Sequence, residues 1–243
     1  MKCCPEGSWP QLAVDYAPKG EKLDVEGVSV YHIGSGNKGL VIIEDIFGTH
    51  SGRHSVIADM FASKGYNVYM PELLDPYYDG PMDMGQILEY IKTHQAKYEA
   101  MTIRFEKTLA YIKQQGINNF VSIGFCWGTW FAFKMASKHD CFKAIAGPHP
   151  SLGAEGLITG GNPLNLAETV KCPAYFMPAG NDPDDVKEKG AIVEALIKRF
   201  GPELVGTTHF PDMVHGWVVR GDIKDEKVER DFHQAINIIQ KYF

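Results

Sequence analysis

The chain has 243 residues and a mass of 27.1 kDa, which is within the range of one large α/β domain. Its hydrophobic fraction of 44% supplies enough apolar side chains for a sizeable core and excludes wholesale disorder. A formal charge of −6 without a long run of Lys or Arg argues against a nucleic-acid partner, and no apolar run reaches the ~20 residues of a membrane span. Five scattered cysteines favour a reducing compartment, so we expect a cytoplasmic protein, with a mitochondrial location left open.

Predicted strands and helices alternate along the chain. The predicted strands span residues 27–33, 39–45, 66–70, 119–125, 142–146, 172–179 and 205–210. The predicted helices span residues 53–64, 85–115, 129–139, 186–200 and 228–242, and the stretches 72–84 and 147–170 are predicted loops. This alternation predicts an α/β fold in which helices cover both faces of a mostly parallel, twisted sheet. We expect residues 1–243 to form a single domain, on which residues 1–25 pack as an N-terminal extension.

A cysteine lies at the point where a predicted strand passes into a predicted helix. The sequence Gly-Phe-Cys-Trp-Gly at residues 124–128 matches the G-x-S-x-G nucleophile elbow, with Cys126 in place of serine. Glycine is favoured at both positions, because so sharp a turn leaves little room for neighbouring side chains. The turn also directs the cysteine at a helix N-terminus, whose dipole favours a thiolate. Cys126 is therefore a candidate nucleophile, and a buried core cysteine is the alternative interpretation.

Two further strand ends carry residues that suit such a nucleophile. Asp182 follows the strand predicted at 172–179, and an Asp there can accept the Nδ1 proton of an imidazole. Asp184 and Asp185 are close alternatives for this role. His215 follows the last predicted strand and precedes the terminal helix. The order nucleophile, acid and base is that of the α/β-hydrolase fold, and the joint arrangement is more specific than any one member.

These motifs resemble the dienelactone hydrolase family, the Cys-His-Asp branch of the α/β-hydrolases, and especially its eukaryotic, carboxymethylenebutenolidase-like members. The resemblance runs nearly end to end and includes Cys3-Cys4, residues 16–20, residues 44–48, the elbow, His149-Pro150-Ser151 and residues 215–222. It implies an α/β-hydrolase fold and a hydrolase that forms a thioester intermediate. It also implies that Cys126 is the nucleophile, His215 the general base and Asp182 the acid that orients the base.

The segment Asp45-Ile46-Phe47-Gly48 ends the strand predicted at 39–45. If that strand neighbours the elbow strand, the backbone N–H groups of Ile46 and Trp127 form the oxyanion hole, with one donor from each loop. The resemblance implies that an acidic side chain at Asp45 contacts the resting thiol and disfavours the thiolate by repulsion. By the alternation of side chains along a strand alone, Glu44 is the other candidate for this contact.

Three more residues are candidates for contact with the substrate, namely Phe47, His149 and Arg220. Bacterial members of the family hold a substrate carboxylate with two arginines, one of them in the loop after the third strand. Here the corresponding loop, 72–84, contains no Arg or Lys and three Asp residues. An anionic dienelactone would therefore find poor charge compensation, and the family resemblance leaves the substrate open.

Other motifs do not indicate a cofactor or a metal. Residues 34–39 match G-x-G-x-x-G, but the dinucleotide fingerprint must open a helix, whereas a strand follows here. His50 and His54 have a spacing that metal sites use, yet no third ligand is near. Cys3 and Cys4 could bind a soft metal or form a vicinal disulfide, and we interpret them as a simple pair of thiols. We expect neither a cofactor nor a metal site.

The sequence hypothesis is a hydrolase that cleaves ester or lactone bonds of small molecules. Two alternatives belong to other classes. A class I glutamine amidotransferase also uses a cysteine elbow, but it pairs its histidine with a Glu two residues later, and position 217 is Trp. A catalytically silent family member could instead serve as a subunit or binding scaffold of a larger assembly. The sequence leaves a homo-oligomer or incorporation into a larger complex open.

Overall fold

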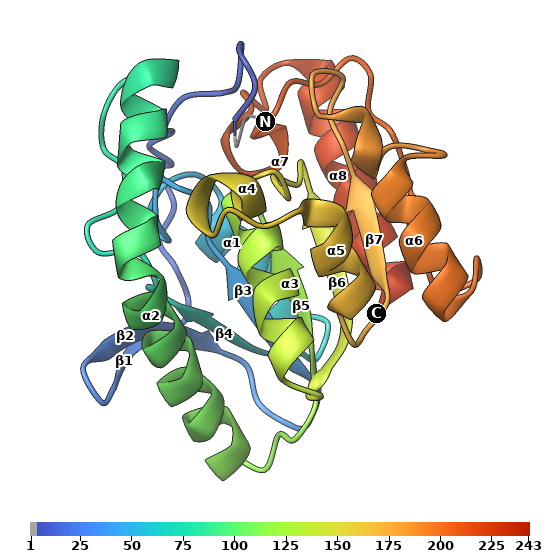
Figure 1. The fold of residues 1–243 in the computed structure, drawn as a ribbon. Helices are drawn as coiled ribbons and strands as arrows, with labels where there is room; N and C mark the ends of the chain where they lie inside the picture. The colour runs from blue at the N-terminus through green and yellow to red at the C-terminus, as the bar shows by residue number, and fades with distance from the viewer. Residues whose placement is uncertain (1–3) are drawn as a thin grey trace.

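An eight-stranded sheet, in the order β1-β2-β4-β3-β5-β6-β7-β8, forms the centre of the protein (Figure 1). The computed structural model describes residues 4–243, apart from the side chains of residues 95 and 96. Its strands are β1 (Glu21–Val25), β2 (Val28–Ile33), β3 (Gly39–Ile43), β4 (Asn67–Pro71), β5 (Phe120–Gly124), β6 (Phe142–Pro148), β7 (Ala174–Met177) and β8 (Gly206–Thr207). The pairs β1–β2 and β2–β4 are antiparallel, and the other five pairs are parallel. This mixed, mostly parallel sheet confirms the predicted α/β-hydrolase fold class.

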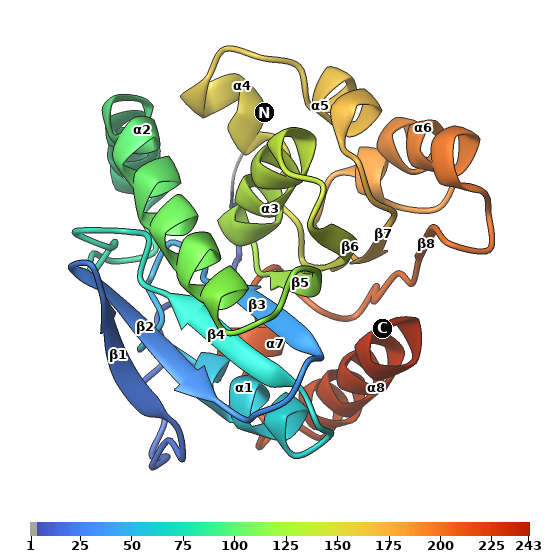
Figure 2. The same ribbon diagram turned by 90° about the horizontal axis from the view of Figure 1, so that it is seen from below.

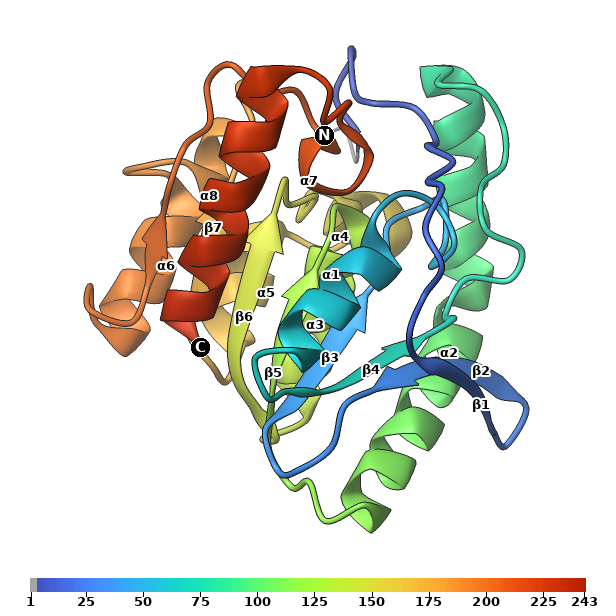
Figure 3. The same ribbon diagram turned by 180° about the vertical axis from the view of Figure 1, so that it is seen from behind.

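Helices cover both faces of the sheet, as the alternating pattern predicts (Figures 2 and 3). The helices are α1 (His54–Ala62), α2 (Met84–Gln114), α3 (Trp127–Lys138), α4 (Ala154–Ile158), α5 (Pro163–Thr169), α6 (Ala191–Phe200), α7 (Trp217–Arg220) and α8 (Glu226–Tyr242). Helices α2, α3, α5 and α6 lie on one face, and α1 and α8 lie on the other. Within the described part of the chain, no helix is long and apolar enough to cross a membrane.

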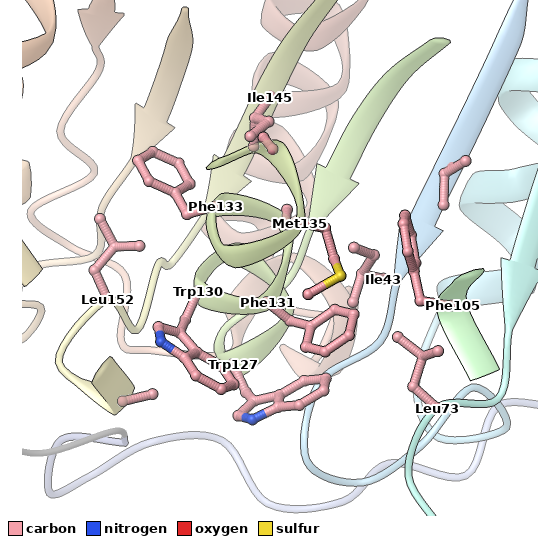
Figure 4. Close-up of a cluster of buried hydrophobic side chains, with 14 of the residues drawn as sticks. Ile43, Leu73, Phe105, Trp127, Trp130, Phe131, Phe133, Met135, Ile145 and Leu152 are labelled. Atoms are coloured by element: carbon pink, nitrogen blue, oxygen red, sulfur yellow. The ribbon is translucent and has the colours of Figure 1, made fainter. Parts of the chain in front are cut away.

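Each face of the sheet has its own hydrophobic cluster. On the α3 face, aromatic side chains dominate the packing (Figure 4), and the rings of Trp127 and Phe131 stack with centroids 5.2 Å apart. On the opposite face, Phe61 of α1 and Phe232 of α8 belong to the second cluster. Helix α3 is buried along most of its length, which fixes the position of its first residue and hence of the preceding Cys126.

Three predicted boundaries differ from the structure. The loop predicted at 147–170 contains α4 and α5. Helix α5 carries a local signal, because the side chain of Asn162 caps it by accepting from the N–H of Leu164 and Pro163 occupies the first turn. The helix predicted at 186–200 begins only at Ala191, after a short 3-10 turn. The strand predicted at 205–210 is reduced to two residues, because its end forms a single bridge instead of a ladder.

Two short elements were not predicted. Residues 21–25, within the expected N-terminal extension, form the edge strand β1 of the sheet. Three of its five residues are charged, and charged residues on an exposed edge strand weaken the hydrophobic pattern that identifies a strand. Helix α7 directly follows the loop of His215, but its four residues are too few for a helical period to show.

A methyl group at Gly128 should disrupt the junction between α3 and β3. A Cβ there would overlap the backbone carbonyl oxygens of Glu44 and Ile43, which cannot rotate away as a flexible side chain can. Gly128→Ala should therefore lower the free energy of unfolding by ~1–3 kcal/mol, measured by urea denaturation. Gly85→Ala is the control, because its Cβ would meet only the Asp83 side chain, at 3.2 Å, and Ala in a helix gains ~0.5–1 kcal/mol. Equal effects of the two substitutions would contradict this packing.

Candidate active site

The turn between β5 and α3 holds Cys126 in a backbone conformation that L-residues rarely adopt. Its φ is 53° and its ψ is −117°. Neighbouring segments hold this conformation, because the Cys126 carbonyl accepts hydrogen bonds from the N–H groups of Ser151 and Thr129 at 3.0 and 3.1 Å. The Sγ atom lies 3.4 Å from the Ser151 hydroxyl. The strained turn thus presents the sulfur at the N-terminus of a buried helix.

The end of β3 lies directly beside this turn. Ile43 pairs with Gly124 in the parallel β3–β5 ladder, and the Ile43 carbonyl accepts from the N–H of Phe125 at 3.1 Å. The loop that begins at Glu44 therefore runs next to the elbow. Ile46 in this loop is fully buried, and Trp127 is the first residue of α3, where a backbone N–H has no intrahelical acceptor. Ile46 and Trp127 thus belong to adjacent loops, and an oxyanion hole formed by their N–H groups stays a prediction.

Asp182 and His215 form a buried pair. The imidazole Nδ1 lies 2.6 Å from Asp182 Oδ1, and neither side chain is exposed. Asp182 Oδ2 accepts from the N–H of Ala179 at 2.7 Å, which fixes the carboxylate. Burial lowers the pKa of His215, but the Asp182 charge and hydrogen bond, together with the Cys4 thiol, outweigh it and raise that pKa to about 10. The pair therefore orients a readily protonated imidazole with its Nε2 edge turned away from Asp182.

Three side chains from distant parts of the sequence meet at this imidazole. The Sγ atoms of Cys4 and Cys126 and a ring nitrogen of His215 all lie within 4.8 Å of one another. The two sulfur atoms are 3.6 Å apart, and both cysteines are completely buried. Cys4 was missed as a site residue at the sequence level, although Cys3-Cys4 was among the family motifs; Cys3 lies outside the described residues. The structure thus brings nucleophile and base candidates together under a cover.

That cover is the segment of residues 4–20, which we call the N-terminal strap. Its backbone bonds to the loop of the histidine, because the N–H of Trp9 donates to the His215 carbonyl at 2.9 Å. The Asn181 side chain donates to the Glu6 carbonyl at 2.9 Å, and Arg220 Nε donates to the Trp9 carbonyl at 3.0 Å. From there the strap runs along the molecule to β1 (dark blue in Figure 3). The strap therefore bridges the loop of Asp182, the loop of His215 and helix α7.

The family model for the dienelactone hydrolase family matches residues 27–243. This chain belongs to the dienelactone hydrolase family. The human carboxymethylenebutenolidase homolog is 26% identical over 215 residues, covering 85% of this chain and 82% of the relative. Hydrolase tropI of Talaromyces stipitatus is 25% identical over 262 residues, covering 100% and 96%. A putative dienelactone hydrolase from Klebsiella pneumoniae has the same fold, with a TM-score of 0.67 at 17% identity over 91% of this chain and 98% of that one.

Family membership confirms the resemblance inferred from the motifs and replaces the glutamine amidotransferase alternative. The match to the family model begins at residue 27 and therefore includes all the strand ends from which the candidate site is built. The strap precedes that range, so the cover over the site lies outside the region that the family model describes. Among the described residues, one cluster of potential metal ligands occurs, formed by Cys4, Cys126 and His215. His54, a candidate ligand by spacing, instead engages the Ser51 carbonyl through Nδ1.

Asp45 pairs with a residue of α7 in this family member. Its carboxylate forms a fully buried ion pair with the Arg220 guanidinium and also accepts from the N–H of Phe47 at 2.9 Å. The guanidinium lies over the Phe47 ring, 4.7 Å from its centroid. Burial lowers the pKa of Arg220 to about 10. The contact of Asp45 with the thiol and the substrate contacts of Phe47 and Arg220 stay predictions, and the structure joins these three residues to one another.

His149 lies at the same end of the sheet, beside the imidazole of His215. Its ring centroid is 5.0 Å from that of His215, and its side chain is fully buried. Burial and the neighbouring His215 hold the pKa of His149 well below its usual value, so the ring is neutral. Its φ of 38° is a second strained backbone conformation at this site. His149 therefore borders the base, and its contact with the substrate stays a prediction.

Replacing one member of the Asp45–Arg220 ion pair should lower the free energy of unfolding more than replacing both members. Arg220→Met leaves a buried carboxylate without its cation, and Asp45→Asn leaves the reverse, so each should lower the free energy of unfolding by ~3–5 kcal/mol. The double variant should recover part of that loss, because neither buried charge is then left alone. Urea denaturation of the four proteins gives the interaction free energy. Strictly additive losses would show that the two side chains do not stabilise one another.

Glu44 faces away from the Asp45–Arg220 ion pair, toward the loop after β4. Its carboxyl oxygen accepts from the N–H groups of Leu73 and Leu74 at 2.9 and 2.8 Å. Burial nevertheless raises its pKa from 4.5 to about 8, against the opposing effect of those two bonds. The folded protein therefore holds a proton that the unfolded chain releases between these pH values. The free energy of unfolding should fall as the pH rises through this window.

Glu44→Gln should remove this dependence, because an amide oxygen can still accept the two bonds but does not titrate. We compare the free energy of unfolding of the variant with that of the wild type at pH 5 and at pH 8. The difference should shift in favour of the variant by at least ~1 kcal/mol between pH 5 and pH 8, which corresponds to about 2–4 °C in Tm. Differential scanning calorimetry at both pH values provides the measurement. Glu89→Gln, at an exposed position of α2, is the control and should follow the wild type. Parallel curves for Glu44→Gln would contradict the buried, protonated carboxyl.

Proposed function

We propose that this member of the dienelactone hydrolase family cleaves ester or lactone bonds of small molecules through Cys126, His215 and Asp182. The observation that carries the proposal is the placement of the Cys126 sulfur within 4.8 Å of an imidazole nitrogen of His215. That imidazole is itself held by Asp182 at 2.6 Å. A nucleophile, a base and a residue that orients the base are the three parts that acyl transfer by a cysteine requires.

The reaction begins with attack of the Cys126 thiolate on the substrate carbonyl. An imidazolium beside a thiol stabilises its thiolate, and His215 has a pKa raised to about 10. The N–H groups of Ile46 and Trp127 stabilise the resulting oxyanion. His215 donates its proton to the departing alkoxide, which leaves a thioester on Cys126. The imidazole then removes a proton from water, which attacks the thioester and releases the acid and the thiolate.

The charges around the site favour a neutral substrate. The loop 72–84 has no basic residue, and the guanidinium of Arg220 already neutralises Asp45. A carboxylate on the substrate would therefore lack a ready cation, whereas an uncharged ester or lactone needs none. Because the Cys126 side chain is completely buried and Cys4 lies 3.6 Å from its sulfur, we expect substrate entry to require a shift of the strap.

The same burial favours the second candidate, a catalytically silent member that serves as a subunit or binding scaffold. A sulfur with no exposed surface is compatible with a pocket that has closed permanently. In that case the triad geometry would persist as part of the packing. The two candidates differ in whether the purified protein turns over any ester.

Replacement of the nucleophile should separate these candidates. Cys126→Ala should reduce hydrolysis of p-nitrophenyl acetate and of a neutral lactone to the uncatalysed rate, since no thioester can form. Asp182→Asn should lower kcat by ~10²–10⁴-fold through loss of the imidazole orientation. Cys141→Ala, at a buried thiol on the segment before β6, is the matched control and should retain activity. Far-UV and near-UV circular dichroism verify that each variant is folded.

Equal rates for the wild type and Cys126→Ala would refute the assigned nucleophile. Absence of turnover by a folded wild type, across a panel of esters and lactones, would favour the scaffold candidate.

A further inference from the structure

The strap places a second thiol directly against the proposed nucleophile. Cys4 and Cys126 are 122 residues apart in sequence, yet their Sγ atoms are 3.6 Å apart. A disulfide bond is ~2.05 Å long, so the sulfurs need to approach by about 1.5 Å to bond. Because Cys4 belongs to the strap and not to the sheet or a helix, its main chain has no ladder or helical hydrogen bonds that resist such an approach.

A proton acceptor stands beside both sulfurs. The ring nitrogen of His215 completes a set of three atoms that all lie within 4.8 Å of one another. An imidazole beside two thiols can take the proton of either one when a small movement brings it into hydrogen-bond contact, and it stabilises the thiolate, which is the reactive form in oxidation and disulfide exchange. The other described cysteines differ in this respect, because burial raises the pKa of Cys141 and raises that of Cys172 to about 12. Of the described thiols, Cys4 and Cys126 are the pair that shares a neighbouring imidazole nitrogen.

Exposed residues follow Cys4 closely along the strap, although Cys4 itself is fully buried in a hydrophobic cluster. Glu6 and Gly7, two and three residues further along, are exposed. This end of the strap is held in part by hydrogen bonds that water can replace, from Asn181 to the Glu6 carbonyl and between Trp9 and His215. Displacement of this end is the movement that would bring a small oxidant to the two sulfurs.

We propose that Cys4 and Cys126 form a reversible disulfide when the protein meets a hydroperoxide. The Cys126 thiolate attacks one oxygen of the peroxide, breaks the O–O bond and becomes a sulfenic acid, while the other oxygen leaves as hydroxide. The Cys4 thiol gives its proton to the released hydroxide, which becomes the first water, and its sulfur attacks the Cys126 sulfur. The S–S bond forms as the S–O bond breaks, and the sulfenic oxygen leaves as the second water with the proton that His215 holds. Two thiols and one hydrogen peroxide thus give one disulfide and two waters, and a dithiol reductant reverses the oxidation.

This modification has two consequences, of which the first rests on the proposed function. The disulfide removes the nucleophile from catalysis and bonds the strap over the site, so hydrolysis stops until a reductant acts. It also prevents further oxidation of Cys126, since a sulfenic acid that forms a disulfide does not proceed to the irreversible sulfinic acid. Cys4 is then a resolving thiol on a removable cover.

The test is peroxide treatment of the full-length protein followed by alkylation and non-reducing peptide mapping. The expected product is a cross-link between the peptides of Cys4 and Cys126, about 2 Da lighter than the reduced pair and lost on addition of dithiothreitol. Cys3→Ser and Cys4→Ser are matched variants at adjacent positions. Cys3→Ser should keep the cross-link and recover its activity on reduction. Cys4→Ser should lose the cross-link and accumulate sulfinic acid at Cys126. After peroxide treatment, dithiothreitol should therefore no longer restore the activity of this variant.

Other products would overturn the proposal. Examples are sulfinic acid at Cys126 with Cys4 still alkylated in the wild type, a cross-link that persists in Cys4→Ser, and two thiols that remain alkylated after peroxide. The cross-link is read by mass and needs no turnover. A cross-link in a protein whose hydrolysis is unaffected by Cys126→Ala would uphold the disulfide and refute only the hydrolase proposal.

Discussion

The close approach of α3 to the end of β3 is the constraint on which the candidate site depends. Gly128 packs against the main-chain carbonyls of Ile43 and Glu44, so the backbone of the helix is in direct contact with the backbone at the end of the strand. This contact, and the parallel pairing of Ile43 with Gly124, leaves the chain only a strained turn in which to pass from strand to helix. Cys126 takes the positive φ of that turn. The strain is possible because the buried aromatic face of α3 holds the helix in place.

The buried charges around this turn are compensated in different ways. Asp182 is neutralised by an imidazole that can carry a proton, whereas Asp45 is neutralised by a guanidinium that retains its charge. Among residues 4–243, none places a cation within hydrogen-bond distance of Glu44, and burial raises its pKa to about 8, so this acid holds a proton instead. Three acids within one end of the sheet thus reach low net charge by proton sharing, ion pairing and protonation. Of the groups that compensate these acids, the imidazole of His215 is the one that lies beside the Cys126 sulfur.

The parts of the fold that could be predicted are those encoded by local patterns. Strand and helix alternation predicts the parallel sheet, and glycines on either side of a cysteine predict the elbow, since both signals lie within a few residues. The parts that were missed depend on contacts between distant residues. The pairing of Asp45 with Arg220 spans 175 residues, and the contact of Cys4 with Cys126 spans 122, so neither leaves a trace in the local sequence. Strand β1 was missed because three of its five residues are charged, and helix α7 because four residues are too few for a helical period.

The strap also determines when the site can close during synthesis. Its carbonyl at Trp9 bonds to Arg220, and these residues are 211 positions apart, so this part of the strap can dock only after almost the whole chain has been made. The other end has earlier partners, because Leu12 bonds to Gly52 and Tyr16 bonds to Asp59. The part that lies over His215 is therefore the last to be attached. Attachment by a few hydrogen bonds allows this part to open locally while the sheet beneath it stays folded.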